Sequence, residues 1–217
     1  MLVGRQADRL EVIADDLRVR GAEEVLALRA DLAKSSAHTA LLETIISHIQ
    51  TVDIALVAYG TLPDQETCNA DVETAMQAIE TNGTSVVSLT MLLANLFEKQ
   101  GRGSLAVISS VAGDRGRQSN FTYGSAKALV QATLSGLRNR LYKQQISVLD
   151  IRPGFVDTPM TAEFDKSPLW AKPDKVAVQI VKGIDQQKDV VYTPGFWRLI
   201  MFAIRHLPES LFKRLSL

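Results

Sequence analysis

The chain has 217 residues, of which 46% are hydrophobic and 22% are charged, a composition typical of one folded domain and not of a disordered chain. Its 24 lysines and arginines balance its 24 aspartates and glutamates, so nothing in the charge favours a nucleic-acid partner. A single cysteine excludes an intramolecular disulfide, the three histidines lack metal-site spacing, and no apolar run reaches the roughly 18 residues of a membrane span. Because no secretory signal precedes the first predicted helix, we expect a cytoplasmic protein.

Helical and strand-like stretches alternate along the chain. Helices are predicted where apolar residues recur every three or four positions, and strands where short apolar runs end at glycine or proline. In chain order, the predicted elements are a helix through Leu10–Leu17, a strand at Val25–Arg29, a helix at about Ser35–Gln50, a strand at Asp53–Tyr59, helices at about Gln65–Ile79 and Gly83–Lys99, a strand at Ser104–Ser109, a helix at Thr122–Gln144, a strand at Ile146–Ile151, a helix at Pro173–Asp185 and a strand at Val190–Thr193.

This alternation of strands and helices predicts an α/β fold with a parallel sheet covered on both faces. The strands lack polar alternation, so we expect them to be buried on both sides. We expect this domain to occupy residues 1–194, and an amphipathic helical tail, broken at Pro208, to occupy residues 195–217.

A tyrosine and a lysine form the first chemical motif. Tyr123 and Lys127 are four residues apart in a predicted helix, a spacing that places both on one face. An ammonium near a phenol favours the phenolate and lowers the pKa of the phenol, so such a tyrosine can act as a general acid or base near neutral pH. The alternative is a surface pair without a chemical role.

Further polar residues follow the predicted strands. Ser110 ends one buried strand, 13 positions before the tyrosine, and the segment Arg152–Thr158 follows the next strand. An earlier strand ends at Gly60, and Asn82 lies near the start of a later helix. The carboxyl ends of parallel strands meet at one edge of a sheet, where open α/β sheets bind ligands. We therefore expect these residues to line one crevice.

In these features the chain resembles the short-chain dehydrogenase/reductases, and the resemblance implies a Rossmann-like, doubly wound parallel sheet. The segment Ile108–Gly113 is similar to the strand and turn that carry the catalytic serine of that family. By this resemblance the catalytic residues are Asn82, Ser110, Tyr123 and Lys127. The cofactor-binding residues it implies are Arg5, Asp31, Leu32, Gly60, Tyr123, Lys127, Pro153, Gly154, Val156 and Thr158, and no metal is implied.

Three segments are similar to one bacterial branch of the family, which includes a reductase of a lipid-linked 2-keto pentose, a decaprenylphosphoryl sugar. They are Ala58–Gly60, Asn120–Gly124 and Phe196–Arg198. The resemblance thus implies a small-molecule or lipid-linked carbonyl substrate. It also implies a homodimer or homotetramer that pairs through the helices Gly83–Lys99 and Thr122–Gln144.

The implied reaction is reduction of a ketone to a secondary alcohol, or the reverse. Tyr123 would protonate the developing alkoxide, Ser110 would orient its oxygen, and Lys127 would hold the nicotinamide ribose. Asn82 would support a proton relay through water. In the family, a basic residue at the end of the second strand pairs with the 2′-phosphate of NADP, so Arg5 favours NADP(H) over NAD(H).

The sequence departs from the family in one large feature. The family opens with a strand and a Gly-rich turn that binds the pyrophosphate at a helix N-terminus, whereas Met1–Val3 already resembles the end of the second strand. The first strand of a doubly wound sheet is central, so its loss would leave the strands on either side without a partner. Either the recorded start lies too late, or the chain is a truncated and catalytically inactive form that serves as an association protein.

Each site residue has a simpler alternative explanation. Ser110 could merely end its strand, Asn82 could cap a helix, Asp31 could cap or turn the chain, Arg5 could be a solvated charge, and Thr158 could stabilise its own loop. The tail mixes apolar and basic residues, which fits a packed helix or a dimer contact. It also fits a helix that lies on the inner face of a membrane.

Overall fold

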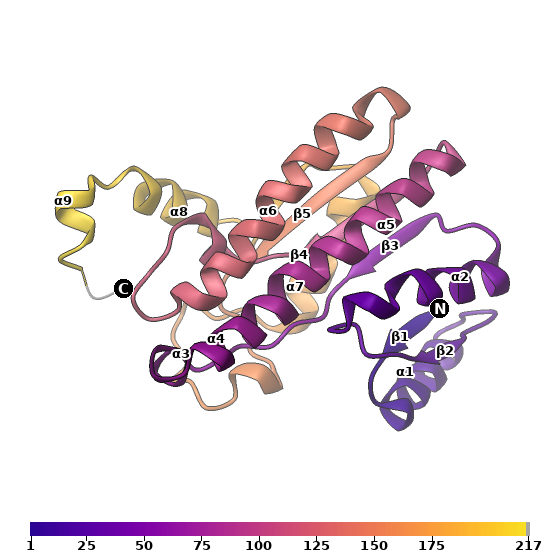
Figure 1. Cartoon of the computed structure of the whole chain (residues 1–217), viewed down its shortest axis with the longest axis horizontal. Helices are drawn as coiled ribbons and strands as arrows, with labels where there is room; N and C mark the ends of the chain where they lie inside the picture. The colour runs from indigo at the N-terminus through magenta and orange to yellow at the C-terminus, as the bar shows by residue number, and fades with distance from the viewer. Residues whose placement is uncertain (216–217) are drawn as a thin grey trace.

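The computed structural model describes residues 1–215, arranged as parallel strands between layers of helices (Figure 1). The strands are β1 (Leu2–Gly4), β2 (Ala27–Arg29), β3 (Ile54–Val57), β4 (Ser104–Ile108), β5 (Ser147–Pro153) and β6 (Val190–Thr193). The α-helices are α1 (Ala7–Val19), α2 (His38–Ile49), α3 (Gln65–Ala70), α4 (Val72–Ile79), α5 (Ser85–Gln100), α6 (Phe121–Leu141), α7 (Pro173–Asp185), α8 (Trp197–His206) and α9 (Glu209–Phe212).

Every strand pair is parallel, as the alternation of elements predicts. The order β3-β4-β5-β6 forms one sheet, and β2 pairs with β1 in a second. The α/β fold with a Rossmann-like arrangement is thereby confirmed. Because the connections are parallel crossovers, the carboxyl ends of β3, β4 and β5 lie at one edge of the larger sheet.

The main core lies between the larger sheet and the helices α5 and α6. Phe97 of α5 and Leu134 of α6 are fully buried there, against Leu105 and Val107 of β4. On the opposite face, α7 packs Ile180 and its neighbours onto alternate residues of β4 and β5. The central strands β4 and β5 are therefore buried on both sides.

A groove separates edge strand β1 of the smaller sheet from edge strand β3 of the larger sheet. Among the described residues, β1 pairs only with β2 and β3 pairs only with β4, so each has one edge without a strand partner. The groove between these edges encloses about 390 Å³ and is lined mainly by apolar side chains, including Val3 and Leu56. In β3, Ile54 is 54% and Leu56 48% exposed, so the prediction that every strand is buried on both faces is wrong for this strand. The reason is that both side chains line the groove between the two edges.

Two predicted helices differ from the structure at their junction. The predicted helix Gln65–Ile79 is two helices, because the backbone at Asp71 is extended and its carboxylate caps α4 by accepting from the amides of Glu73 and Thr74. The predicted break before Gly83 is instead a π-helical turn, Glu80–Thr84, that joins α4 to α5 without a gap.

The tail lies at the opposite end of the molecule from the β1–α1–β2 unit (Figure 1). Pro208 separates α8 from α9, as predicted. The break follows from chemistry, since proline lacks the amide hydrogen that continues a helix. Among residues 1–215, no helix combines the length and apolar character that crossing a bilayer requires.

Candidate active site

Ser110 stands at the carboxyl end of β4, where the strand passes into a short 3-10 turn, Val111–Asp114. Its hydroxyl accepts a hydrogen bond from the amide of Ala112 at 3.1 Å and so caps that turn. Gln131 of α6 donates to the carbonyl oxygen of Ser110 at 2.7 Å. The serine is therefore fixed from two sides, with its hydroxyl at the sheet edge.

The first turns of α6 carry Tyr123 and Lys127 against this edge. Lys127 is buried, and its Nζ donates to the carbonyl oxygen of Ile108 at 3.2 Å. It lies 5.5 Å from the centre of the Tyr123 ring. The structure thus places both residues on one face of α6, as predicted.

Burial shifts the pKa of each group in the direction that favours its neutral form. It raises the pKa of Tyr123 to about 12, which the neighbouring Ser110 hydroxyl partly opposes. It lowers the pKa of Lys127 to about 8, which the carboxylate of Asp150 partly opposes. Desolvation of the phenol is the largest cause of this raised pKa, and the Lys127 ammonium donates to the strand backbone, so a lowering of the Tyr123 pKa by Lys127 stays a prediction.

Asn82 reaches the same edge from the π-helical turn between α4 and α5. It is fully buried, its Oδ1 accepts from the amide of Thr61 at 2.8 Å, and its Nδ2 donates to the carbonyl oxygen of Ala78 at 2.9 Å. A Cβ on Gly60 would lie 2.7 Å from the Asn82 Oδ1 and 3.6 Å from the Lys127 Nζ. The glycine therefore permits the close approach of these two side chains to the end of β3. Asn82 is a bridge to the loop after β3 and not a helix cap.

The loop after β5 completes this edge of the sheet. Pro153 is the last residue of β5, and the amide of Gly154 donates to Thr193 of β6 at 3.1 Å. Val156 forms an isolated parallel bridge with Ala171. Thr158 precedes a short 3-10 turn, Pro159–Thr161, and its amide donates to the Thr161 hydroxyl at 3.2 Å.

The structure does not bring the remaining predicted residues into contact with this group. Arg5 follows β1 and is exposed, and Asp31 follows β2, so both lie at the carboxyl edge of the smaller sheet. Asp31 accepts from the amide of Ala33 at 3.2 Å, which is a turn contact. Leu32 lines the groove between the sheets.

A family model described as short chain dehydrogenase matches residues 1–168 of the chain. The chain belongs to the short-chain dehydrogenase family. An uncharacterized oxidoreductase of Mycobacterium tuberculosis (strain ATCC 25618 / H37Rv) is 35% identical over 215 residues, which cover 99% of this chain and 86% of the relative. One from Streptomyces coelicolor is 36% identical over 214 residues, which cover 99% and 84%. These relatives support an enzyme of the oxidoreductase class, as the sequence predicts.

Solved structures show the same fold. A short-chain dehydrogenase from Sphingobium yanoikuyae in complex with NADPH superposes with a TM-score of 0.80 at 24% identity, over 96% of this chain and 86% of the other. A 3-oxoacyl-[acyl-carrier protein] reductase from Brucella melitensis in complex with NAD gives a TM-score of 0.78 at 20% identity, over 91% and 86%. The Rossmann-like fold class is confirmed by both.

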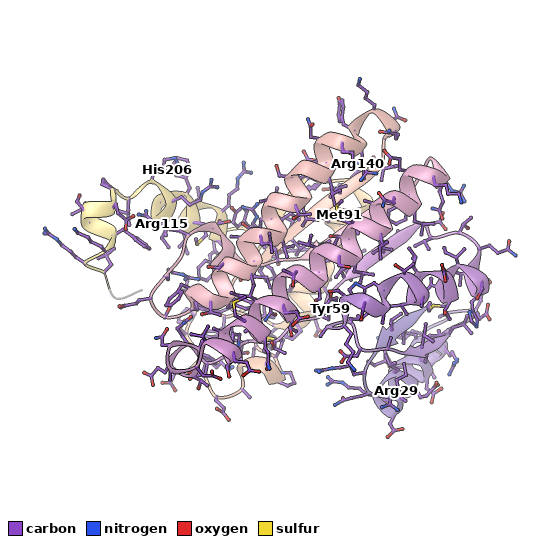
Figure 2. The ribbon with its side chains drawn as sticks, in the orientation of Figure 1. Arg29, Tyr59, Met91, Arg115, Arg140 and His206 are labelled. Atoms are coloured by element: carbon purple, nitrogen blue, oxygen red, sulfur yellow. The ribbon has the colours of Figure 1, made fainter. Side chains whose placement is uncertain are left out.

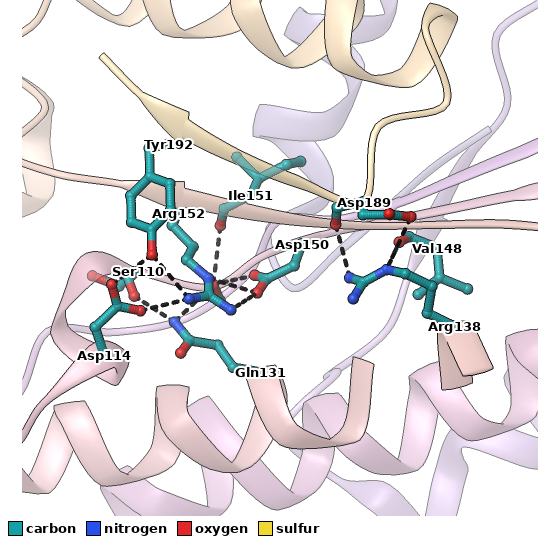
Figure 3. Close-up of polar contacts among 11 residues, drawn as sticks. Ser110, Asp114, Gln131, Arg138, Val148, Asp150, Ile151, Arg152, Asp189 and Tyr192 are labelled. Carbon is teal, nitrogen blue, oxygen red and sulfur yellow. Dashed lines mark hydrogen bonds and ion pairs between the residues drawn. The ribbon is translucent and has the colours of Figure 1, made fainter. Parts of the chain in front are cut away.

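Behind the serine of this short-chain dehydrogenase lies a buried ionic cluster that the sequence analysis missed (Figure 3). Arg152 of β5 donates to Asp150 at 2.7 Å and to Asp114 at 2.7 Å, and Tyr192 of β6 donates to Asp114 at 2.7 Å. Ser109 donates to the other oxygen of Asp150. Asp114 ends the turn that Ser110 begins, so the cluster connects that turn to β5 and β6. The sequence did contain a signal for this cluster. Asp150 and Arg152 are two residues apart in an apolar strand and therefore lie on the same face of it.

Proposed function

We propose that this short-chain dehydrogenase reduces a ketone to a secondary alcohol with NADP(H), and that Tyr123 is the proton donor. The observation that carries the proposal is the convergence of Ser110, Tyr123, Lys127 and Asn82 at the carboxyl edge of the larger sheet. A phenol with a pKa of about 12 is protonated throughout the neutral range. It is therefore able to give a proton to an alkoxide.

Each residue of the group has a separate task. The Tyr123 hydroxyl donates its proton to the carbonyl oxygen as that oxygen gains negative charge, and the resulting phenolate is reprotonated from solvent. The Ser110 hydroxyl, held at the sheet edge by its turn, orients the same oxygen. Asn82 fixes the loop after β3 beside Lys127 and so supports the path by which the proton returns.

The chain's own residues would bind both ends of a nicotinamide dinucleotide. Tyr123 and Lys127 would hold the nicotinamide ribose, and Pro153, Gly154, Val156 and Thr158 form the loop beside the ring. Arg5, Asp31, Leu32 and Gly60 would bind the adenosine end, where the exposed guanidinium at the end of β1 fits a 2′-phosphate. When bound, the cofactor supplies the hydride.

The decisive experiment is titration of the 217-residue chain with NADPH and NADH, followed by intrinsic fluorescence. We expect a micromolar Kd for NADPH, and replacement of Arg5 by alanine should raise this Kd by about tenfold or more while leaving that for NADH unchanged. Arg9→Ala, an exposed arginine on α1, is the matched control. An equal loss for NADPH and NADH in Arg5→Ala would overturn the NADP preference.

The second candidate is a catalytically inactive association protein. The specific observation in its favour is the pair of unpartnered edges on β1 and β3, because strand edges of this kind pair with other chains. Absence of NADPH binding at millimolar concentration, in a chain that is folded by circular dichroism, would favour this candidate over the reductase.

We propose an apolar substrate, which includes a lipid-linked ketone. Beyond the Pro153-Gly154 loop, the ring of Phe155 stacks on Trp170 with centroids 5.2 Å apart, and Phe164 lies 6.4 Å from the same tryptophan. Phe164 is 53% and Leu169 40% exposed, so this wall presents apolar surface to solvent.

We also propose that the chain forms a homodimer or homotetramer through α5 and α6. Met91 on α5 is an exposed apolar side chain on the proposed contact surface (Figure 2).

The low pKa of Lys127 gives a pH dependence. We expect NADPH affinity to fall by about tenfold as the pH rises through about 8, because the ammonium proposed to bind the ribose loses its proton there. Fluorescence titrations across the range measure this. In Lys127→Met the step should vanish, and an unchanged step in that variant would assign it to another group.

A further inference from the structure

The outer face of α8 is apolar in its middle and basic at its ends. Leu199 is 74% and Phe202 63% exposed on this ten-residue helix. Arg198 and Arg205 flank them at helical spacing, and His206 lies beside Phe202, with ring centroids 4.3 Å apart. We call these five residues the α8 outer face. Two large exposed apolar side chains within a basic rim are a feature of interaction surfaces.

This face is held rigidly on the domain. On the opposite side of α8, Trp197 and Met201 are buried against Val111, the first residue of the turn that Ser110 caps. A Cβ on Gly154 would lie 1.9 Å from the indole nitrogen of Trp197, so the helix packs directly on the loop after β5. The orientation of the outer face is therefore set by both loops that border the active site.

Arg115 secures the end of α8 (Figure 2). Its Nη1 donates to the carbonyl oxygens of Ile204 at 2.6 Å and Leu207 at 2.7 Å, and its Nη2 pairs with Glu209 at 2.7 Å. Its guanidinium also lies 3.6 Å from the centre of the Phe212 ring. One arginine thus neutralises the only acidic residue of the tail and joins α8 to α9.

Charge is segregated into the tail. The whole chain has no net charge, yet residues 195–217 contain four basic residues, Arg198, Arg205, Lys213 and Arg214, and one acidic residue, Glu209. Because Arg115 pairs with Glu209, the field of the tail is positive. Apolar side chains within such a field complement a bilayer that carries anionic headgroups.

We propose that the α8 outer face docks on an anionic phospholipid surface, with Leu199 and Phe202 inserted among the headgroups and Arg198 and Arg205 on the phosphates. The anionic cytoplasmic leaflet is the source of these lipids. A second copy is the poorer occupant, because a two-fold contact through this face brings the arginines of one copy close to those of the other. The proposal stands apart from the proposed reductase activity.

The test is co-sedimentation of the full chain with phosphatidylcholine vesicles containing about one third phosphatidylserine, compared with pure phosphatidylcholine vesicles. We expect binding to the anionic vesicles only. Leu199→Asp with Phe202→Asp should weaken it at least about tenfold. Arg198→Gln with Arg205→Gln should weaken it by roughly ten- to thirtyfold.

The matched control is Val178→Asp with Val181→Asp on α7. These valines are also three residues apart and are 67% and 56% exposed, so their replacement changes apolar surface and charge without touching α8. We expect vesicle binding within about twofold of the wild type.

Equal losses in the α7 and α8 variants would overturn the proposal, as would wild-type protein that stays in the supernatant. A change from dimer to monomer in the α8 variant, with vesicle binding intact, would assign the face to a second copy instead. NADPH affinity, measured in parallel, reports separately on the proposed reductase.

Discussion

Replacement of Tyr123 by phenylalanine is expected to lower kcat by about 10²–10⁴-fold while changing the Kd for NADPH by less than about threefold. The substitution removes one hydroxyl and keeps the ring that packs beside Lys127. In the proposed reaction, the proton that this hydroxyl gives to the alkoxide is needed only as the transition state forms, so its loss should lower the rate of chemistry and spare cofactor binding.

The measurement is NADPH oxidation with a panel of apolar ketones, together with a fluorescence titration of each variant. Tyr142→Phe is the matched control, because Tyr142 is 79% exposed just after the far end of α6. It should turn over at the wild-type rate. A Tyr123→Phe enzyme that retains more than about a tenth of the wild-type kcat would remove Tyr123 from the role of proton donor.

Replacement of Arg152 by methionine is expected to lower the free energy of unfolding by about 3–5 kcal/mol. Its guanidinium compensates two carboxylates, Asp114 and Asp150, whose side chains are 0% and 1% exposed. Without it, each carboxylate keeps one direct hydrogen bond, from Ser109 or Tyr192, and the cations Lys127 and Arg117 offset the two buried charges only at longer range (Figure 3). Denaturant unfolding with an unchanged m value measures the loss.

Two further variants separate burial from charge. Arg140→Met removes a partly exposed arginine that pairs with Glu98 on the surface of α5 and α6, and it should cost about 1 kcal/mol or less. Adding Asp114→Asn and Asp150→Asn to Arg152→Met should restore much of the lost stability, because neutral amides carry a smaller desolvation cost than carboxylates. A cost for Arg152→Met equal to that for Arg140→Met would contradict the buried cluster.

Local signals predicted the elements that depend on local chemistry. The helix at Pro173–Asp185 and the strand at Val190–Thr193 have the predicted bounds. The proline suits the first turn of a helix, and the apolar run of the strand is short and unbroken. The break of the tail at Pro208 follows from the same kind of rule.

The spacing of Ser110, Tyr123 and Lys127 likewise led to the family, which the comparison with known proteins confirms. What spacing could not supply is the environment of each group. The pKa of Tyr123 is raised to about 12 although a lysine lies beside it, because desolvation depends on every atom that surrounds the phenol.

By itself, the sequence predicted the parallel α/β fold, the placement of Tyr123 and Lys127 on one helix face, and the amphipathic character of the tail, since these depend on the pattern of residues along the chain. Only the tertiary structure revealed the cluster around Arg152, which joins Asp114, Asp150 and Tyr192 across 78 positions of sequence. It alone showed that Arg115 holds the tail and leaves Leu199 and Phe202 exposed. Such contacts depend on distances between elements far apart in the chain, and periodicity along the chain contains no information about those distances.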